Sequence, residues 1–363
     1  MRSRVDCRGI WLFGSYSRGS YECHTYSNSS GRVDDFSSIS PFDCSMILER
    51  FFSDEKKKGI LSFFLYSLSK VFKILIDLRH LLYRKQFFKE HPSCIFTVCV
   101  GSIFVGGSGK TPLVRLLLEH LGDDVFVLTR GYRNLDEPLF YKNCVIEKDR
   151  VRGAKNCLEK GAKAIIMDDG LQHLRLKKDV KIVVLTREQL YNGWHFLPYG
   201  SLRDTPLILN SVDFVVLHEM ETQDDYLQAQ NFLKSFDIPR FIGTATEFAG
   251  FFTLDGTPVS PVKRAFLFSG IARPHRFRNM CESLGVDVLG HEIVADHEKI
   301  SLSRLKKLIE GAQSKGAYLI MTEKDAVKYP ITEGVLQAKI RTRITFDQHN
   351  FDFLLGKFHE TVD

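Results

Sequence analysis

The sequence predicts an α/β fold, in which a mostly parallel sheet is flanked by helices and a second, smaller α/β lobe follows toward the C-terminus. Short apolar segments recur along the chain from residue 95, and segments with helical periodicity separate several of them. Alternation of this kind favours parallel strands joined by helical crossovers. In addition, Gly-Gly-Ser-Gly-Lys-Thr at 106–111 lies between an apolar and a helical segment, as expected of a loop that joins a strand to a helix.

The expected elements follow from these patterns. Strands are expected at 95–105, 125–129, 164–167, 182–185, 214–217, 265–269 and 318–321. Helices are expected at 112–121, 151–160, 277–284 and 301–315. Because a chain of 363 residues favours two domains, we expect a core at 92–205 and a second lobe at 206–363 that closes over a cleft.

The first 45 residues have a different composition. They are rich in Ser, Gly, Arg and Tyr and show no sustained periodicity. They also lack the apolar core of a secretory signal peptide, so we expect a poorly ordered extension at 1–45. Organised sequence begins at Met46, and we hypothesise that this methionine is the native start, which N-terminal sequencing would test.

Composition argues against several classes of protein. The net charge of +6 is too small for the whole chain to be a nucleic-acid binder. The eight cysteines are scattered and form no Cys-x-x-Cys pair, which argues against a zinc knuckle or a disulfide framework and favours a reducing compartment. No long uncharged apolar run qualifies as a transmembrane helix.

The loop at 106–111 has the composition of the phosphate-binding loop of P-loop NTPases. Its glycines allow a tight turn that brings backbone N–H groups close to phosphate oxygens, and the next helix adds the positive end of its dipole. Lys110 can reach the β- and γ-phosphates of ATP, and the Thr111 hydroxyl can bind Mg²⁺. The full pattern has glycine where this chain has Phe104, so the alternative is a glycine-rich turn with a chance Lys-Thr pair. The residues expected to bind the nucleotide are Gly106, Gly107, Ser108, Gly109, Lys110 and Thr111.

Two carboxylates, Asp168 and Asp169, end the apolar segment at 164–167. A carboxylate at the C-terminal end of a strand can hold Mg²⁺ beside a phosphate loop. An Asp-Asp-Gly sequence is also common in turns, but the upstream loop favours a metal role for at least one of the two.

Two arginines, Arg130 and Arg133, follow the second expected strand. Because parallel strands end at one edge of a sheet, these side chains are expected near the phosphate loop, where a guanidinium can contact phosphate with two hydrogen bonds. The alternative is a solvated basic loop.

The segment at 46–91 is basic and amphipathic. Between residues 56 and 90 it carries nine basic residues but only Asp77 and Glu90 as acids, and aromatic and aliphatic residues lie between them. This pattern is typical of a helix in the membrane interface. A single tilted span with lysines that reach the surface and an ordinary core-packing helix are the alternatives.

Other polar groups are ambiguous on their own. Asp136 precedes Glu-Pro and reads as a turn residue, and His297, which follows Asp296, reads as a surface residue or a satisfied core group. The aromatic loop at 192–204 can cover a site or merely connect elements. Thr-Glu-Lys-Asp at 322–325 can line a cleft or cap a helix.

Taken together, these motifs resemble the tetraacyldisaccharide 4′-kinases of lipid A biosynthesis, and the resemblance runs from about residue 61 to about residue 328. It rests on motifs in one order, at 100–102, 106–112, 129–132, 136–138, 168–173, 192–194, 197–198, 200–203, 270–272, 296–297 and 322–327. The family itself lacks the first glycine of the usual phosphate loop, so Phe104 agrees with it.

The resemblance implies a kinase that transfers the γ-phosphate of ATP to the 4′-hydroxyl of an acylated glucosamine disaccharide 1-phosphate. It implies that Asp136 is the base on the acceptor hydroxyl, that His297 assists it, and that Lys110 binds the β- and γ-phosphates. Leu135 stands where the family has glycine, and the stretch between Tyr132 and Asp136 is shortened.

The resemblance also implies a binding set and a location. Arg130 would join the nucleotide site. The metal set for Mg²⁺ would be Thr111, Asp168, Asp169 and Asp204, where Asp204 replaces the family's usual glutamate. The partners would be the acylated lipid substrate and the membrane surface, without nucleic acid or an obligate protein partner. The location would be the cytoplasmic face of the bacterial inner membrane, peripheral or monotopic, with residues 56–90 as the docking helix.

Two other functions fit parts of the chain. A membrane-associated P-loop NTPase that acts as a nucleotide switch is the first, but a guanine-specific switch usually carries Asn-Lys-x-Asp, and the Lys324 and Asp325 of this chain are adjacent. A kinase for a soluble small molecule is the second, and it leaves residues 56–90 unexplained.

Overall fold

The computed structural model describes residues 56–131, 141–192, 194–271, 274–295, 299–329 and 333–362. The chain divides into two compact units, 1–66 and 67–363, and the sheet and the candidate site belong to the second. The basic amphipathic segment forms helix α2 (Lys56–Arg84), which crosses this division. None of the helices in these ranges is both long and apolar enough to cross a membrane.

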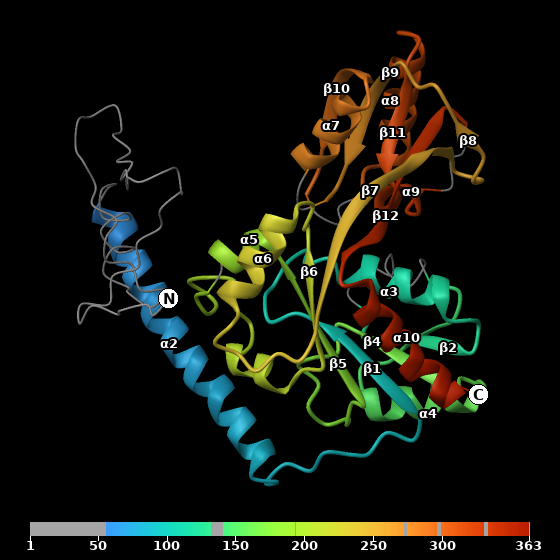
Figure 1. Ribbon diagram of the computed structural model, residues 1–363. Helices are drawn as coiled ribbons and strands as arrows, with labels where there is room; N and C mark the ends of the chain where they lie inside the picture. Colours follow the sequence, from blue (N-terminus) through green and yellow to red (C-terminus); the bar gives the residue numbers. More distant parts are fainter. Residues whose placement is uncertain are drawn as a thin grey trace, which may run out of the picture. The chain divides into compact units, whose positions relative to one another are not determined.

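One twelve-stranded sheet runs through the second unit (Figure 1). Its first part is parallel, with the strand order β3-β2-β4-β1-β5-β6-β7. These strands are β1 (Phe96–Gly101), β2 (Val125–Thr129), β3 (Cys144–Ile146), β4 (Ala164–Asp168), β5 (Val180–Thr186), β6 (Phe214–His218) and β7 (Phe241–Thr253). This confirms the prediction of a mostly parallel sheet.

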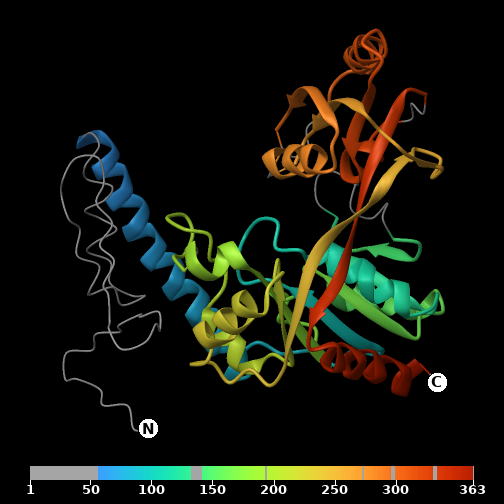
Figure 2. The ribbon, with the colours of Figure 1, turned by 45° about the horizontal axis from the view of Figure 1, so that its top comes forward.

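The strand β7 links this part to a second lobe. It pairs antiparallel with β12 (Val335–Phe346) along most of its length, and the two long strands form a ribbon between the lobes (Figure 2). Beyond the ribbon the order continues as β12-β11-β9-β10, again parallel. The remaining strands are β8 (Pro258–Val259), β9 (Arg264–Ser269), β10 (Asp287–Ile293) and β11 (Tyr318–Thr322).

Helices cover both faces of the parallel part because successive strand residues point to opposite faces. Val98 and Val100 of β1 pack with α3 (Lys110–His120) and α10 (Gln348–Val362) on one face. Cys99 packs on the other face. That face is covered by α4 (Arg150–Glu159), α5 (Arg187–Asn192) and α6 (Gln223–Phe232).

Two separate clusters form the interior of the second lobe. One packs α7 (Pro274–Ser283) and the other α8 (Leu302–Gln313) against β9 and β11. The short helix α9 (Glu323–Ala326) follows β11 directly.

The C-terminal helix returns to the first lobe, where Phe351, Leu354 and Phe358 are fully or almost fully buried among the residues of β1 and β5. The second lobe is therefore an excursion of the chain that leaves by β7 and comes back by β12. As folding units, the ranges 92–205 and 206–363 stay a prediction.

Candidate active site

The glycine loop lies where the sequence predicts it, between the end of β1 and the start of α3. Gly106 and Gly109 have φ angles of 97° and 80°, a region that L-residues with a side chain rarely adopt. Gly109 is also crowded, since a Cβ there would lie 2.7 Å from Cδ2 of His218. Phe104 is fully buried and its ring meets the ring of Trp194 edge-on, with centroids 5.6 Å apart.

His218 fixes the far side of this loop, and the sequence did not indicate it. The residue ends β6, and its side chain is almost completely buried. Its Nδ1 lies 3.0 Å from Oγ1 of Thr244, and its Nε2 lies 3.2 Å from Oγ1 of Thr246. Both threonines belong to β7, so the loop rests on the strand that leads to the second lobe.

Lys110 and Thr111 are the first two residues of α3. Lys110 Nζ donates to Ser108 Oγ at 3.2 Å and lies 3.6 Å from Oδ1 of Asp169. The first turn of α3 contains no acidic residue, so the positive end of the helix dipole is not neutralised by its own side chains. This arrangement can bind phosphate.

Asp168 and Asp169 reach the same place through strand pairing. β4 lies beside β1 with Asp168 opposite Val100, so both carboxylates emerge at the edge where the loop begins. The Tyr141 hydroxyl donates to Asp168 Oδ2 at 2.8 Å. Asp169 has a φ of 55°, which is uncommon for a residue other than glycine.

Arg203 ties Asp169 to the start of the loop. Its Nη1 donates to Asp169 Oδ2 at 2.8 Å and its Nη2 donates to the other carboxylate oxygen. Its Nε and Nη2 also donate to the carbonyl oxygen of Ser102, at 3.2 and 3.0 Å. The sequence alone indicates no separate role for Arg203, although this residue ends the Gly-Ser-Leu-Arg motif at 200–203.

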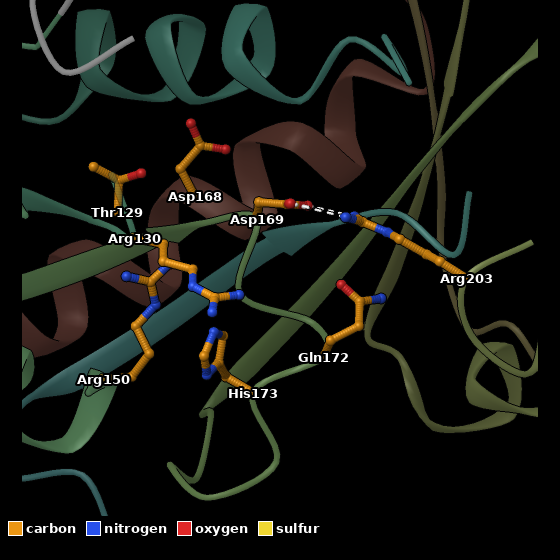
Figure 3. Close-up of a pocket in the computed structure, with 8 residues that line it drawn as sticks. All are labelled: Thr129, Arg130, Arg150, Asp168, Asp169, Gln172, His173 and Arg203. Carbon is orange, nitrogen blue, oxygen red and sulfur yellow. Dashed lines mark hydrogen bonds and ion pairs between the residues drawn. The ribbon is translucent and has the colours of Figure 1, made fainter. Parts of the chain in front are cut away.

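A cavity of about 190 Å³ opens beside these carboxylates (Figure 3). Asp168 and Asp169 lie on one side of it, and Arg130, Arg150 and His173 lie together on another. The full lining is Thr129, Arg130, Arg150, Asp168, Asp169, Gln172, His173 and Arg203. The placement of Arg130 agrees with its predicted position near the loop.

The basic side of the cavity contains a buried guanidinium group with a hydrogen-bond donor that no described residue uses. Arg150 is 3% exposed, and its Nε has no hydrogen-bond partner among the described residues. Burial, with Arg150 and Arg130 nearby, lowers the pKa of His173 to about 4, so its imidazole is neutral at neutral pH. A buried donor without a partner is costly, and an anion in the cavity would satisfy it.

The metal prediction can be tested on the donor set. Magnesium is usually held by one or two carboxylates together with phosphates and water, and Asp168, Asp169 and Thr111 supply oxygens of this kind beside the loop. Within the described ranges, no group of three or more His, Cys, Asp or Glu side chains is arranged to hold a metal. The residues therefore fit Mg²⁺ bound jointly with a phosphate ligand.

Asp204 lies close to this group, and its oxygens have protein partners, as those of Asp169 do. It is 1% exposed. Its Oδ1 lies 2.6 Å from Nε2 of His80 and accepts from the Thr205 N–H at 2.9 Å, and its Oδ2 accepts from Gln172 at 3.2 Å. Its metal role stays a prediction.

The two residues predicted to handle the acceptor proton, Asp136 and His297, lie outside the described residues, as do Arg133 and Asp296. The structure places their neighbours. Arg130 and Tyr141 flank the first segment, and both face Asp168 or its cavity. The described residues on either side of Asp136 therefore lie at the candidate site.

The comparison with known families shows which family the chain belongs to. A family model described as Tetraacyldisaccharide-1-P 4'-kinase matches residues 61–141 and 135–359. The chain belongs to this kinase family. The membership confirms the resemblance read from the motifs and the prediction of a phosphotransferase of lipid A biosynthesis, and it removes the nucleotide switch as an alternative.

Relatives in the family match most of the chain. The Tetraacyldisaccharide 4'-kinase of Haemophilus influenzae is 31% identical over 76% of this chain and 85% of its own. The protein of that name from Chlamydia pneumoniae is 29% identical over 81% of this chain and 89% of its own. The crystal structure of the "apo" form of LpxK from Aquifex aeolicus in complex with ATP is 22% identical, with a TM-score of 0.64 over 82% of this chain and 99% of that chain. It confirms the fold.

Proposed function

We propose that this chain transfers the γ-phosphate of ATP to the 4′-hydroxyl of a tetraacyl glucosamine disaccharide 1-phosphate. The observation that carries the proposal is the cavity beside Asp168 and Asp169, where carboxylates that fit Mg²⁺ face the buried Arg150 and the exposed Arg130, in a chain of the 4′-kinase family. The crystallised LpxK neighbour is in complex with ATP, which supports ATP as the donor.

The donor side is formed by residues of the loop and β4. Backbone N–H groups at 106–109 and the start of α3 would cradle the phosphates, and Lys110 would bind the β- and γ-phosphates. Thr111, Asp168 and Asp169 would hold Mg²⁺, which neutralises phosphate charge when bound. Lys110 already lies 3.6 Å from Asp169, so cation and carboxylate are positioned around one space.

The acceptor side is formed by the basic wall of the cavity. Arg150 supplies a guanidinium group that can bind an anion through charge-assisted hydrogen bonds, and Arg130, which we assign to the nucleotide, lies beside it. His173 is neutral at physiological pH, so it can donate one hydrogen bond and accept another. This wall suits a sugar headgroup that carries both hydroxyls and a phosphate.

The proton of the acceptor hydroxyl needs a base, and we assign that role to Asp136, with His297 assisting. A positioned carboxylate contributes about 10²–10⁴-fold to such a step. The support is that Arg130 and Tyr141, at the two ends of the segment with Asp136, lie at the cavity and at Asp168.

Helix α2 gives the chain a means of reaching a lipid acceptor. From Leu68 onward it leaves an apolar stripe exposed at helical spacing: Leu68, Val71, Ile74, Leu75, Leu78 and Leu81. Exposed side chains of this kind bury into a membrane interface at a gain of about 25 cal/mol per Å². We propose that this stripe docks the enzyme on the cytoplasmic face of the inner membrane.

The deciding experiment follows the label of γ-³²P-ATP into a tetraacyl disaccharide 1-phosphate in detergent. We expect labelled lipid, and no labelled product when glucosamine 1-phosphate replaces the lipid. Lipid that stays unlabelled while the protein binds ATP would overturn the proposal, and a labelled soluble sugar would favour the soluble-substrate kinase. Asp136→Ala is expected to lower turnover at least about a hundredfold; near-normal turnover would move the base elsewhere, with Asp296 next in line.

The membrane role is tested by vesicle flotation. Ile74→Ser with Leu75→Ser is expected to release the protein from vesicles of anionic phospholipid. The matched control is Leu158→Ser with Leu207→Ser, because these side chains are also exposed but lie outside α2. Equal flotation of the two double variants would rule out the stripe as the docking surface.

A further inference from the structure

We infer that His80 and Asp204 form a joint that transmits the position of α2 to the phosphate-binding loop. The inference rests on the proposed function, since it takes α2 as the docking helix and the loop as the ATP site. It makes His80 and Asp204 positioning residues, which act through the groups that contact ATP.

The joint itself is a close, largely buried contact. His80 Nε2 lies 2.6 Å from Asp204 Oδ1, with side-chain exposures of 23% and 1%. A carboxylate as buried as Asp204 is costly unless it is paired and hydrogen-bonded. The contact with His80 therefore stabilises the buried carboxylate of Asp204, although 124 positions separate the two residues in the sequence.

The residue before His80 makes a second contact from the same turn of α2. Arg79 Nη2 donates to the carbonyl oxygen of Gln172 at 2.5 Å. The Gln172 side chain in turn donates to Asp204 Oδ2 and to the carbonyl oxygen of Ser102, at 3.2 and 3.0 Å. Arg79 and His80 thus contact two loops of the core, one at Gln172 and the other at Asp204.

One side chain from each of these loops donates a hydrogen bond to the same atom. The Ser102 carbonyl oxygen accepts from Gln172 and from Arg203. Ser102 follows β1 directly and begins the stretch that leads into the glycine loop. One residue, Gln172, therefore lies between Arg79 of α2 and Ser102, which precedes the glycine loop.

The network continues to the phosphate-binding lysine. Arg203, the neighbour of Asp204, holds Asp169, and Asp169 lies 3.6 Å from Lys110 Nζ. A shift of α2 at His80 would change Asp204 and Arg203 together because they are adjacent. We conclude that docking of the apolar stripe sets the geometry of the ATP site through this joint.

The first test is a double-mutant cycle, which measures whether two residues act as one unit. His80→Ala and Asp204→Asn are each expected to lower kcat/KM for ATP about tenfold. The kcat/KM of the double variant is expected to be no lower than that of the less active single variant. His80→Gln keeps a donor and should restore at least a third of the activity. Losses that multiply in the double variant would overturn the joint.

Asp77→Ala is the control on the same helix, because Asp77 is paired with Lys73 at an exposed site. Its activity should stay within twofold of the wild type. The dependence on Mg²⁺ separates the joint from a metal role for Asp204. We expect the half-saturating Mg²⁺ concentration to stay within twofold in His80→Ala and Asp204→Asn; a tenfold rise in Asp204→Asn alone would make Asp204 a metal ligand and overturn the inference.

The second test does not depend on the acceptor. Binding of a non-hydrolysable ATP analogue is measured with and without vesicles of anionic phospholipid. Vesicles are expected to lower the Kd of the wild type at least threefold and that of His80→Ala less than 1.5-fold, while both proteins float with the vesicles. If the wild-type protein floats with the vesicles but its Kd is unchanged, the joint is overturned and the kinase proposal stays intact. Unlabelled lipid in the transfer assay would instead overturn the proposed function itself.

Discussion

The two lobes each place a carboxylate and a lysine beside a strand end, but they use the pair differently. Asp169 follows β4 and pairs with Lys110 at exposures of 17% and 14%. Asp325 lies in α9, just after β11, and its side chain and that of Lys328 are both fully buried at 2.7 Å. Because Asp169 and Lys110 are partly exposed to solvent, a ligand can reach them, whereas the pair of Asp325 and Lys328 is closed to ligands.

Protein donors occupy the oxygens of both Asp325 and Asp169, but the Asp325 pair is also closed to solvent. Asp325 accepts from the Gly270 N–H at 3.0 Å and from the Thr322 hydroxyl at 2.6 Å, in addition to Lys328. A Cβ on Gly270 would lie 3.2 Å from the carbonyl oxygen of Ala295. Asp325 therefore locks the turn at Gly270 against the segment that leads to His297, whereas Asp169 faces the cavity.

The largest effect is expected from breaking the buried pair. Asp325→Ala should lower the free energy of unfolding by about 3–5 kcal/mol, because it leaves Lys328 charged and buried without its partner. Urea denaturation followed by circular dichroism measures this. The double variant Asp325→Ala with Lys328→Met should recover part of the loss. A single-variant loss below about 1 kcal/mol would mean that the pair does not stabilise the turn.

The accessible pair should respond in activity rather than in stability. Lys110→Ala is expected to lower turnover at least about a hundredfold, or roughly 2.7 kcal/mol of transition-state stabilisation. Its unfolding midpoint should remain close to that of the wild type. Lys155→Ala, on the exposed face of α4, is the control and should change neither quantity. A lower turnover explained by an equal loss of folded protein would contradict the contrast between the two pairs.

Helix caps test whether the two lobes unfold together. Thr222 caps α6 in the first lobe and Ser301 caps α8 in the second, each by accepting an N–H of the first turn. Thr222→Ala and Ser301→Ala should each cost about 1 kcal/mol, and their losses should add within about 0.5 kcal/mol. Calorimetry should show one transition in each variant. A separate early transition in Ser301→Ala would show that the second lobe unfolds on its own.

A further effect concerns the pH dependence from the cavity. The unfolded imidazole of His173 has an ordinary pKa of about 6.5, and the folded one has a pKa of about 4. Between these values the unfolded state binds more protons, so stability is lost as the pH falls from 6.5 toward 4. His173→Asn should flatten this dependence in urea unfolding at pH 5 and 7. Burial also lowers the pKa of His195 and His291, but both are present in each protein, so the difference reports His173. An identical slope in both proteins would contradict the shift.

Local patterns explain what the sequence could predict. The phosphate loop, Asp168 and Asp169 each follow an apolar strand within a few residues, so spacing alone brings them to one edge of the sheet. Arg130 was found by the same argument. By contrast, β7 and β12 were missed because they are only partly buried, and the packing of α10 could not be predicted because its partners in β1 and β5 are distant in the sequence.

The remaining site residues depend on contacts between distant parts of the chain. Arg150 lies one residue before the helix expected at 151–160, and nothing in its neighbourhood in the sequence indicates that its side chain is buried at the cavity. His80 lies in a segment read for its membrane character, 124 positions from Asp204. His218 and Gly109 meet only because β6 ends beside the loop. No spacing rule connects such pairs without the topology of the sheet.

The β7–β12 ribbon has a consequence for the integrity of the molecule. The covalent chain passes between the lobes twice, and the two passages are hydrogen-bonded to each other along their length. A protease that cuts the backbone between residues 254 and 334 therefore leaves two fragments that stay associated through the hydrogen bonds between β7 and β12, with α10 still packed on the first lobe. The nicked protein would migrate as one particle on a sizing column and as two bands only after denaturation.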